Sequence, residues 1–243
     1  MTMPSSERLF EVLDKTWPAA RSLKSGPWRL RQGKDGGQRV SAATVEGAFR
    51  DGDIHDAETA MREMKQRPLF MVRGDDVALD TALNDRGYEV VDPVFMYIAP
   101  VSDLTADLPL TAAMPSWPPL AVQLELWAAG GIGPARVAIM ERCTCPKTSL
   151  LGRAGDVPSG TAFSARDGDI AMVHAIEVTP EMRRKGVGRH LINAAANWAG
   201  GQSAKWLALA VTQANEPANA LYRALGMREA AAYHYRRLSE PRG

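Results

Sequence analysis

The chain has 243 residues, of which 45% are apolar and 23% are charged, and its formal net charge at pH 7 is +1. These values are typical of an ordinary globular protein that is long enough for one large or two small domains. A net charge so near zero gives no global reason to expect nucleic acid or a membrane surface as a partner.

The sequence also lacks the signals of an exported, membrane-spanning or metal-binding protein. No apolar run approaches the roughly 20 residues that span a bilayer, and the N-terminus lacks a basic segment followed by an apolar one. Cys143 and Cys145 are too close for an ordinary disulfide, and no neighbouring ligands complete a metal set. We therefore expect a cytoplasmic protein with two reduced thiols and no metal ion.

The first part of the chain alternates between helices and strands. The spacing of apolar residues predicts helices over 7–13, 56–65 and 76–85 and strands over 28–31, 39–44, 69–72 and 88–98. A glycine-rich turn at 33–37 would join the first two strands. Asp75 or Asp76 would cap the third helix, and Gly87 would end it.

Residues 100–118 are rich in proline and small side chains, and we take 106–118 as a linker. Beyond the linker, the pattern predicts helices over 134–142, 186–198 and 216–225 and strands over 149–153, 160–166, 170–178, 206–211 and 228–238. Residues 120–126 fit either a strand or the start of a helix, and the pattern does not decide between them.

The two halves of the chain share a sequence pattern. The stretches 83–89 and 222–228 each end a helix with a glycine and start a strand, so that Gly226 stands in the place of Gly87. Alternating strands and helices predict an α/β protein with a mixed or parallel sheet covered by helices. The shared pattern predicts that the chain is a tandem of two related halves. The alternative is that helix–glycine–strand junctions are common in any α/β protein.

A basic, glycine-bearing turn separates the strand at 170–178 from the helix that follows. Gly186 and Gly188 would let the backbone approach a ligand closely, and the helix N-terminus would add its positive dipole end. The cationic side chains nearby are Arg183, Arg184, Lys185 and Arg189. The turn therefore predicts an anion site. It is neither a P-loop nor a dinucleotide fingerprint, because Leu191 stands where the third glycine would be.

Two motifs in the correct order resemble one known family. Arg183-x-x-Gly186-x-Gly188 is similar to [QR]-x-x-G-x-[GA], the acetyl-coenzyme A pyrophosphate loop of the GNAT N-acetyltransferases. Asn215-x-x-Ala218-x-x-Leu221-Tyr222-x-x-x-Gly226-Met227 resembles the family's N-x-x-A-x-x-L-Y-x-x-x-G-F, with methionine in place of phenylalanine. The resemblance covers residues 120–240 and implies a GNAT-like acyl-coenzyme A N-acyltransferase fold. If the two halves of the chain are related, the whole chain would be a tandem of this fold.

The resemblance also implies roles for individual residues. The backbone of Ile176 and Val178 would pair with the pantetheine arm, and Asn215 would contact it. The pyrophosphate would be held at the loop formed by Arg183, Arg184, Lys185, Gly186, Val187, Gly188 and Arg189. Tyr222 would protonate the departing thiolate, because a phenol with a free pKa near ~10 donates to sulfur without ionising at neutral pH. The alternative for Tyr222 is a core tyrosine on an amphipathic helix.

The base that accepts the proton of the amine has two candidates. His174 lies four residues before Val178, an even spacing that predicts that both side chains share one face of the strand, and some family members carry a base histidine there. Glu177 would project from the other face. The alternatives are a hydrogen-bonded strand histidine for His174, an ion pair with the basic loop for Glu177, and a water relay in place of either.

The first half lacks this set of residues. When Gly87 is matched to Gly226, Leu83 stands in the place of Tyr222 and Asp76 in the place of Asn215. We therefore expect a degenerate GNAT-like domain at 1–105 that packs on the active one and shapes the acceptor pocket. The linker at 106–118 and a catalytic domain at 119–243 would complete the chain.

The leading hypothesis is an acetyl-coenzyme A-dependent N-acetyltransferase. It would acetylate a primary amine of a small molecule or a protein by direct attack in a ternary complex. The alternative is a non-catalytic acyl-coenzyme A-binding regulatory module. Nucleic-acid binding through the loop would require affinity that falls steeply with salt, and the near-zero net charge speaks against it. The acceptor and the oligomeric state, a homodimer included, stay open.

Overall fold

The computed structural model describes residues 2–109 and 111–239, and their contacts divide the chain into two compact units. The first unit comprises the chain up to residue 18 together with 96–211 and 215–230, and the second comprises 19–95, 212–214 and the chain from 231 onward. The chain therefore changes units inside β5 (Tyr88–Pro100) and β11 (Arg228–Leu238), and again at the last residue of β10 (Trp206–Thr212).

The first unit is built on a mixed sheet, as the sequence predicted. Its strands follow the order β5-β10-β9-β8-β7-β6, with β10 parallel to β9 and the pairs from β9 to β6 antiparallel. Their bounds are β6 (Ala113–Ser116), β7 (Lys147–Ala154), β8 (Val157–Asp167), β9 (Ile170–Val178) and β10 (Trp206–Thr212). The segment taken as a linker thus contains a strand, because Ala113–Ser116 pair with Ser149–Gly152 of β7.

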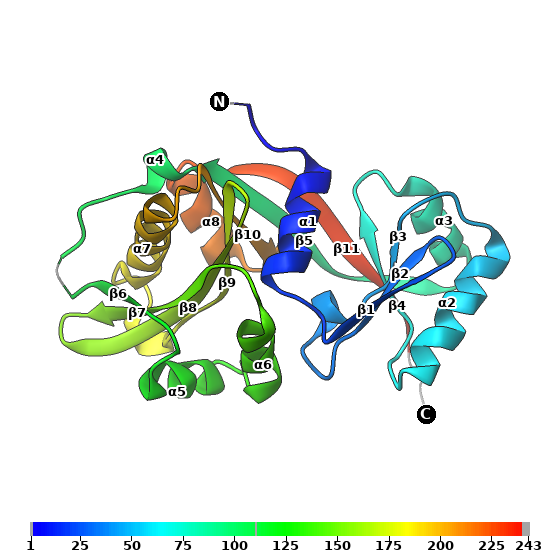
Figure 1. The fold of residues 1–243 in the computed structure, drawn as a ribbon, viewed down its shortest axis with the longest axis horizontal. Helices are drawn as coiled ribbons and strands as arrows, with labels where there is room; N and C mark the ends of the chain where they lie inside the picture. The colour runs from blue at the N-terminus through cyan, green and yellow to red at the C-terminus, as the bar shows by residue number, and fades with distance from the viewer. Residues whose placement is uncertain (1, 110, 240–243) are drawn as a thin grey trace. The chain divides into compact units, whose positions relative to one another are not determined.

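Helices cover both faces of this sheet (Figure 1). The helices of the first unit are α1 (Ser6–Thr16), α4 (Val101–Leu104), α5 (Ala121–Ala129), α6 (Pro134–Arg142), α7 (Val187–Gly201) and α8 (Glu216–Ala224), with a 3-10 turn η2 (Pro180–Met182). On β8, Gly160 faces Val187 of α7, whereas its neighbour Thr161 faces Gln123 of α5. Successive strand residues point to opposite faces, so α7 covers one face and α5 the other.

A pair of glycines lets α7 lie close to the sheet. Gly152 and Gly160 are register partners on β7 and β8. A side chain at either position would meet Val187 of α7 at 3.0 Å, a distance at which the neighbour must give way. The start of α7 is therefore seated directly on the backbone of the sheet.

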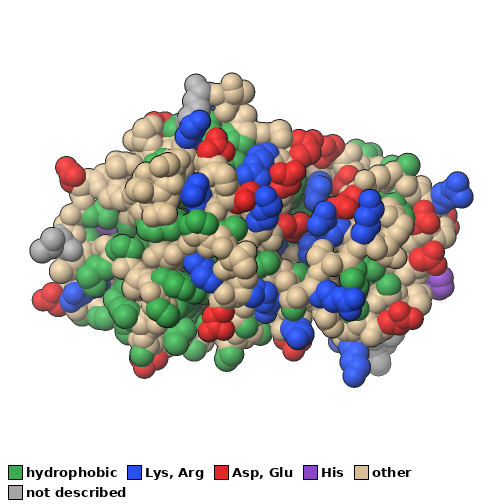
Figure 2. Space-filling view, viewed as in Figure 1, with side chains coloured by type: hydrophobic (Ala, Val, Ile, Leu, Met, Phe, Trp, Pro, Cys, Tyr) green, Lys and Arg blue, Asp and Glu red, His purple; other side chains and the backbone are tan. Residues whose placement is uncertain are grey.

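The segment left undecided by the sequence is a helix. The Gln123 side chain accepts from the backbone N–H of Leu120 at 2.8 Å and so holds the first turn of α5. Gln123 and Trp127 are buried, whereas Leu120 and Leu124 are 45% and 40% exposed. Apolar side chains gather over this helix in Figure 2. Apolar residues on both faces of α5 explain why its periodicity was ambiguous.

No helix within the described residues has the length and apolar character to cross a membrane.

The second unit contains a small antiparallel sheet and two helices. Its elements are β1 (Arg21–Ser25), β2 (Trp28–Gln32), the 3-10 turn η1 (Gln38–Val40), β3 (Thr44–Val45), α2 (Asp51–Glu63), β4 (Leu69–Arg73) and α3 (Val77–Asp85). The small sheet has the order β1-β2-β3, and β4 pairs antiparallel with β11. Its core includes Trp28, Ile54, Met61, Phe70 and Leu79, which are all buried.

The strand predicted at 39–44 was wrong. Residues 38–40 form a 3-10 turn, and Ser41 Oγ donates to the Gly37 carbonyl at 3.0 Å, so only Thr44 and Val45 extend into a strand. The hairpin partner of β2 is β1, which the sequence analysis missed. All residues of β1 except Leu23 are exposed, so it shows no apolar alternation.

The two cysteines lie at the end of α6 and remain free thiols. Both sulfur atoms lie 3.6 Å from the carbonyl oxygen of Lys15 in α1. Burial raises the pKa of the Cys143 thiol to about 11, so this thiol stays protonated at neutral pH. The pair packs α6 against α1.

Candidate functional site

The turn after β9 is the segment that the sequence predicted to bind an anion. Gly186 is the N-cap of α7 with a left-handed φ of 83°, and Arg184 has a φ of 63°. No side chain of the described residues caps α7, and the first backbone N–H to bond back to Gly186 is that of His190. The N–H groups of the first helical turn are therefore available to a ligand, at the positive end of the helix dipole.

A cavity of about 670 Å³ joins this turn to the second motif. It is lined by Ile176, Glu177, Val178, Met182, Arg183, Arg184, Gly186, Val187, Gly188, Arg189, Asn215, Pro217, Ala218, Ala220, Leu221 and Tyr222. Two segments that are distant in the sequence thus meet around one space. Of the residues predicted to bind cofactor or to act in catalysis, the lining omits Lys185 and His174.

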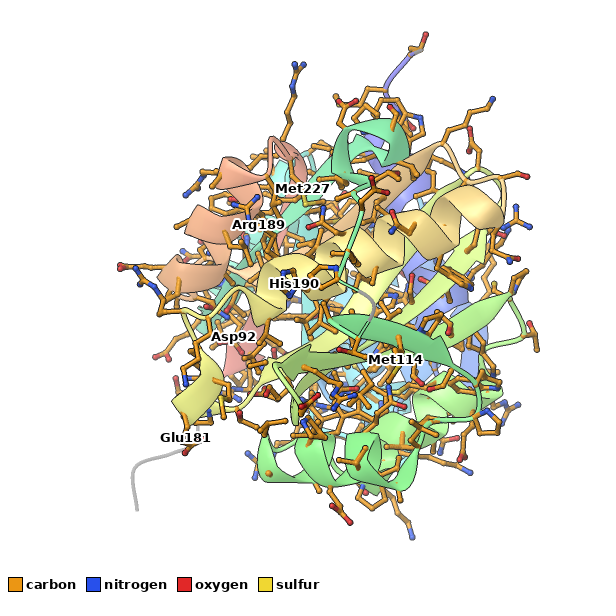
Figure 3. The ribbon with its side chains drawn as sticks, turned by 90° about the vertical axis from the view of Figure 1, so that its left-hand side faces the viewer. Asp92, Met114, Glu181, Arg189, His190 and Met227 are labelled. Atoms are coloured by element: carbon orange, nitrogen blue, oxygen red, sulfur yellow. The ribbon has the colours of Figure 1, made fainter. Side chains whose placement is uncertain are left out.

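Lys185 lies beside a second, smaller cavity of about 460 Å³. Met182, Arg153 and His190 also line it. Figure 3 shows Arg189 on the side of the α7 N-terminus toward α8 and His190 on the side toward β6. The basic residues of the turn therefore point in two directions, and Arg189 belongs to the larger cavity.

Gly188 has a packing role that the motif alone did not reveal. A side-chain carbon at this position would lie 3.1 Å from Cδ2 of Leu221 on α8. The absence of a side chain brings the start of α7 against α8. It also leaves the backbone N–H groups of α7 open to the cavity.

The second motif supplies a helix cap and a buried tyrosine. Asn215 Oδ1 accepts from the Ala218 N–H at 3.2 Å, which caps α8. Tyr222 is 5% exposed and lines the cavity. Burial, and to a lesser degree the nearby Tyr97, raises the pKa of Tyr222 well above its ordinary value. The phenol therefore keeps its proton at neutral pH and can donate it.

Tyr97 of β5 supports this tyrosine and was missed by the sequence analysis. Its ring centroid lies 5.7 Å from that of Tyr222. Its hydroxyl lies 3.0 Å from Asn219 Oδ1 and 3.1 Å from Glu229 Oε1. The residue precedes the family motifs and belongs to the first half of the sequence, so no motif could have indicated it.

His174 lies in the core between the sheet and α1. It is 3% exposed and stacks on Trp17 with ring centroids 5.0 Å apart. The Thr16 hydroxyl donates to the Val12 carbonyl at 2.6 Å and lies 2.9 Å from His174 Nε2. Because the hydroxyl proton is already used, the ring Nε2 must donate to Thr16. The geometry matches the interpretation of a hydrogen-bonded strand histidine.

The prediction that His174 and Val178 share a face was wrong. The register pairs His174 with Phe163 and Glu177 with Thr161. The paired residues are three positions apart on β9 but only two positions apart on β8, so β9 carries one extra residue. This bulge coincides with Ala175, whose φ is 51°. One extra residue reverses the alternation. His174 and Glu177 therefore point to the face covered by α1 and α5.

Glu177 is the carboxylate that lines the cavity. Its side chain is 20% exposed, and its Oε1 lies 3.5 Å from Arg183 Nη2. The ion pair with the basic loop was one of the interpretations of this residue, and it coexists with a place in the cavity that Tyr222 also lines. Among the described residues, His, Cys, Asp and Glu side chains form no group of three that could hold a metal ion.

Comparison with known proteins places these features in a family. Residues 114–227 match the family model described as Acetyltransferase (GNAT) family. "Uncharacterized N-acetyltransferase YobR" of Bacillus subtilis (strain 168) is 27% identical over 252 residues, which cover 96% of this chain and 99% of the relative.

Solved structures show the same fold at low sequence identity. A GCN5-related N-acetyltransferase from Kribbella flavida has a TM-score of 0.74 at 18% identity, covering 99% of this chain and 98% of that chain. A tandem GNAT protein from the clavulanic acid biosynthesis pathway has a TM-score of 0.57 at 15% identity, covering 94% and 86%. Residues 114–227 therefore form an acetyltransferase domain of the GNAT family.

Proposed function

We propose that the protein transfers the acetyl group of acetyl-coenzyme A to a primary amine of a small molecule or protein. One observation carries this proposal: the uncapped N-terminus of α7, Glu177 and Tyr222 all line the same cavity. The N–H groups of the α7 turn fit a pyrophosphate. The strand residues Ile176 and Val178 lie along the cavity, where a pantetheine arm would pair with their backbone.

The residues of the cavity would divide the reaction between them. Acetyl-coenzyme A supplies an activated thioester. Glu177 accepts a proton from the acceptor nitrogen, which must be neutral to attack the thioester carbonyl. Tyr222 donates its proton to the sulfur as the carbon–sulfur bond breaks. The remaining acceleration comes from holding both substrates in line within one site.

Burial and position favour Glu177 over His174 as the base. Glu177 reaches the cavity, whereas His174 lies in the core and uses Nε2 to donate to Thr16. A base has to reach the proton that it removes, directly or through one water. We therefore propose Glu177 as the base and a structural role for His174.

Binding and thiol release together test the function. We expect calorimetry to detect acetyl-coenzyme A binding, and a panel of primary amines to contain at least one that releases free coenzyme A. Binding without release across a broad panel would favour the alternative, a regulatory module that binds acyl-coenzyme A. Absence of binding would contradict both.

Replacing Tyr222 with phenylalanine should slow transfer and spare binding. The variant keeps the ring that packs on Tyr97 and loses only the proton donor. We expect kcat to fall by roughly 10²-fold, the lower end of general acid catalysis, while the acetyl-coenzyme A Kd stays unchanged. Stopped-flow or steady-state thiol release measures kcat, and calorimetry measures Kd. Wild-type turnover would remove the acid role of Tyr222.

Glu177 and His174 should respond differently to substitution. Glu177→Gln removes the proton acceptor, so kcat should fall by about 10²-fold or more with little change in Tm. His174→Gln disturbs a buried hydrogen bond to Thr16 and the stacking on Trp17, so Tm should fall while the pH profile of kcat keeps its shape. A base must lose its proton to act, so kcat should rise with increasing pH. A His174 variant that folds normally but loses this rise would make His174 the base in place of Glu177.

A further inference from the structure

The space beside Glu177 is left open by a glycine on α5. Gly130 is the C-cap of α5, with φ −83° and ψ 8°, a conformation open to any residue. A side-chain carbon there would lie 2.5 Å from both Cγ and Cδ of Glu177 and 2.7 Å from its Oε2. The Glu177 side chain therefore lies directly against the backbone of Gly130.

A second contact fixes α5 at this place on the strand. The Trp127 indole N–H donates to the carbonyl oxygen of Ala175 at 2.8 Å, and Trp127 is fully buried. Ala175 is the bulge residue of β9. Gly130 lies one helical turn beyond Trp127 and hence on the same face of α5. Two residues on one face of α5 thus contact two residues of β9: Trp127 contacts Ala175, and Gly130 contacts Glu177.

The bulge makes this arrangement necessary. Because β9 carries an extra residue at Ala175, Glu177 points to the face covered by α5 instead of the opposite face. A carboxylate on that face meets the end of α5, where most residues would carry a side chain. Only a residue without a side chain leaves the volume that the glutamate occupies.

We propose that Gly130 is a positioning residue: it forms a seat that holds the Glu177 carboxylate at the cavity in the orientation needed to accept the amine proton. This inference rests on the proposed function of Glu177. Gly130 touches no substrate itself and acts only through the side chain that it accommodates. Arg183 restrains the other oxygen of this carboxylate, because its Nη2 lies 3.5 Å from Glu177 Oε1.

The test compares two glycines of the same loop. Gly130→Ala adds a methyl group where Glu177 lies, whereas Gly133→Ala adds one to a residue with φ −81° and no atom within 4 Å. Neither backbone conformation penalises alanine. We expect Gly130→Ala to lower kcat with a responsive amine on the order of 10²-fold, the effect of misplacing a catalytic group by about 1 Å. Gly133→Ala should keep the wild-type kcat.

A double variant separates a positioning role from a folding role. If Gly130 acts only through the Glu177 carboxylate, Gly130→Ala/Glu177→Gln should transfer no more slowly than Glu177→Gln alone. A further drop in kcat in the double variant would contradict this role. The Kd for acetyl-coenzyme A and the Tm of Gly130→Ala should match the wild type, and its pH profile of kcat should lose the limb that Glu177→Gln also loses.

The outcomes distinguish the two levels of the proposal. If the wild type transfers acetyl groups and Gly130→Ala transfers equally fast, the seat is refuted while the proposed function stands. The seat is equally refuted if Gly130→Ala loses activity only together with Tm. If the wild type itself transfers to no amine, the proposed function fails, and the positioning role of Gly130, which depends on it, fails with it.

Discussion

A chain cut to residues 119–243 is expected to be unfolded and unable to bind acetyl-coenzyme A. The cut keeps both family motifs but removes α1 and β5, and α1 and the part of β5 from Met96 onward belong to the same compact unit as the cavity. In that unit β5 lies next to β10 in the sheet. The residues removed from its core include Leu9, Phe10, Val12 and Leu13 of α1 and Met96, Tyr97 and Ile98 of β5, each at most 4% exposed.

The magnitude follows from the area that these side chains bury. Burying one large apolar side chain contributes about 1.5–3 kcal/mol, so seven of them contribute more than roughly 10 kcal/mol. The whole free energy of unfolding of a domain is about 5–15 kcal/mol. Losing both elements should therefore remove the cooperative unfolding transition. Circular dichroism and thermal melting would measure this loss, and calorimetry with acetyl-coenzyme A would measure binding.

Complementation provides the control for this cut. When residues 1–118 are co-expressed with 119–243, the missing helix and strand are restored, and binding of acetyl-coenzyme A should return. A fragment 119–243 that folds and binds on its own would instead support the division of the chain at 106–118, which stays a prediction until this experiment is done.

A reciprocal pair of hydrogen bonds supports the proposal of two related halves. When Gly87 is matched to Gly226, Asp80 matches Asn219 and Tyr97 matches Arg236. Asp80 Oδ1 accepts from Arg236 Nε at 2.8 Å, and Asn219 Oδ1 lies 3.0 Å from the Tyr97 hydroxyl.

The same helix position thus bonds the same strand position twice. In each case the helix of one half contacts the last strand of the other half. A chance likeness of two helix–glycine–strand junctions would not require this reciprocity. The degenerate character of the first half remains a proposal of ours.

The sequence predicted best what is local. Glycines and apolar periodicity placed α3, α6, α7 and α8 within a few residues, and the two motifs identified the segments that line the cavity. These features depend on near neighbours in the chain, such as the left-handed φ that Gly186 adopts before α7.

Three features of the site depended on tertiary context. The bulge at Ala175 has no sequence signal, because alanine is uncommon at a positive φ. Strict alternation along the strand from His174 would place Glu177 on the face away from α5. Tyr97 reaches the site from a strand outside the motifs. His174 has the chemistry of a base, but Thr16 and Trp17 of the distant N-terminal segment enclose it.

Replacing Gly188 with aspartate is expected to abolish acetyl-coenzyme A binding and to leave the fold intact. The new carboxylate would lie in the first turn of α7, where it can accept hydrogen bonds from the N–H groups that we assign to the pyrophosphate. Its negative charge would also repel that anion. An acidic side chain at a helix N-terminus is itself stabilising by about 0.3–1 kcal/mol, which offsets the contact with Leu221 at 3.1 Å. The Tm should therefore change little.

Two further variants separate charge from bulk in this prediction. Gly188→Ala meets the same Leu221 methyl group without adding charge, so it should weaken binding far less than aspartate. Gly201→Asp adds the same charge at the opposite end of α7, where no atom lies within 4 Å, and should bind as the wild type. Calorimetry should show Kd raised by at least about 100-fold for Gly188→Asp alone, roughly 2.7 kcal/mol. Unchanged binding by Gly188→Asp would show that the α7 turn does not hold the pyrophosphate, because no ligand anion could share those N–H groups with a resident carboxylate.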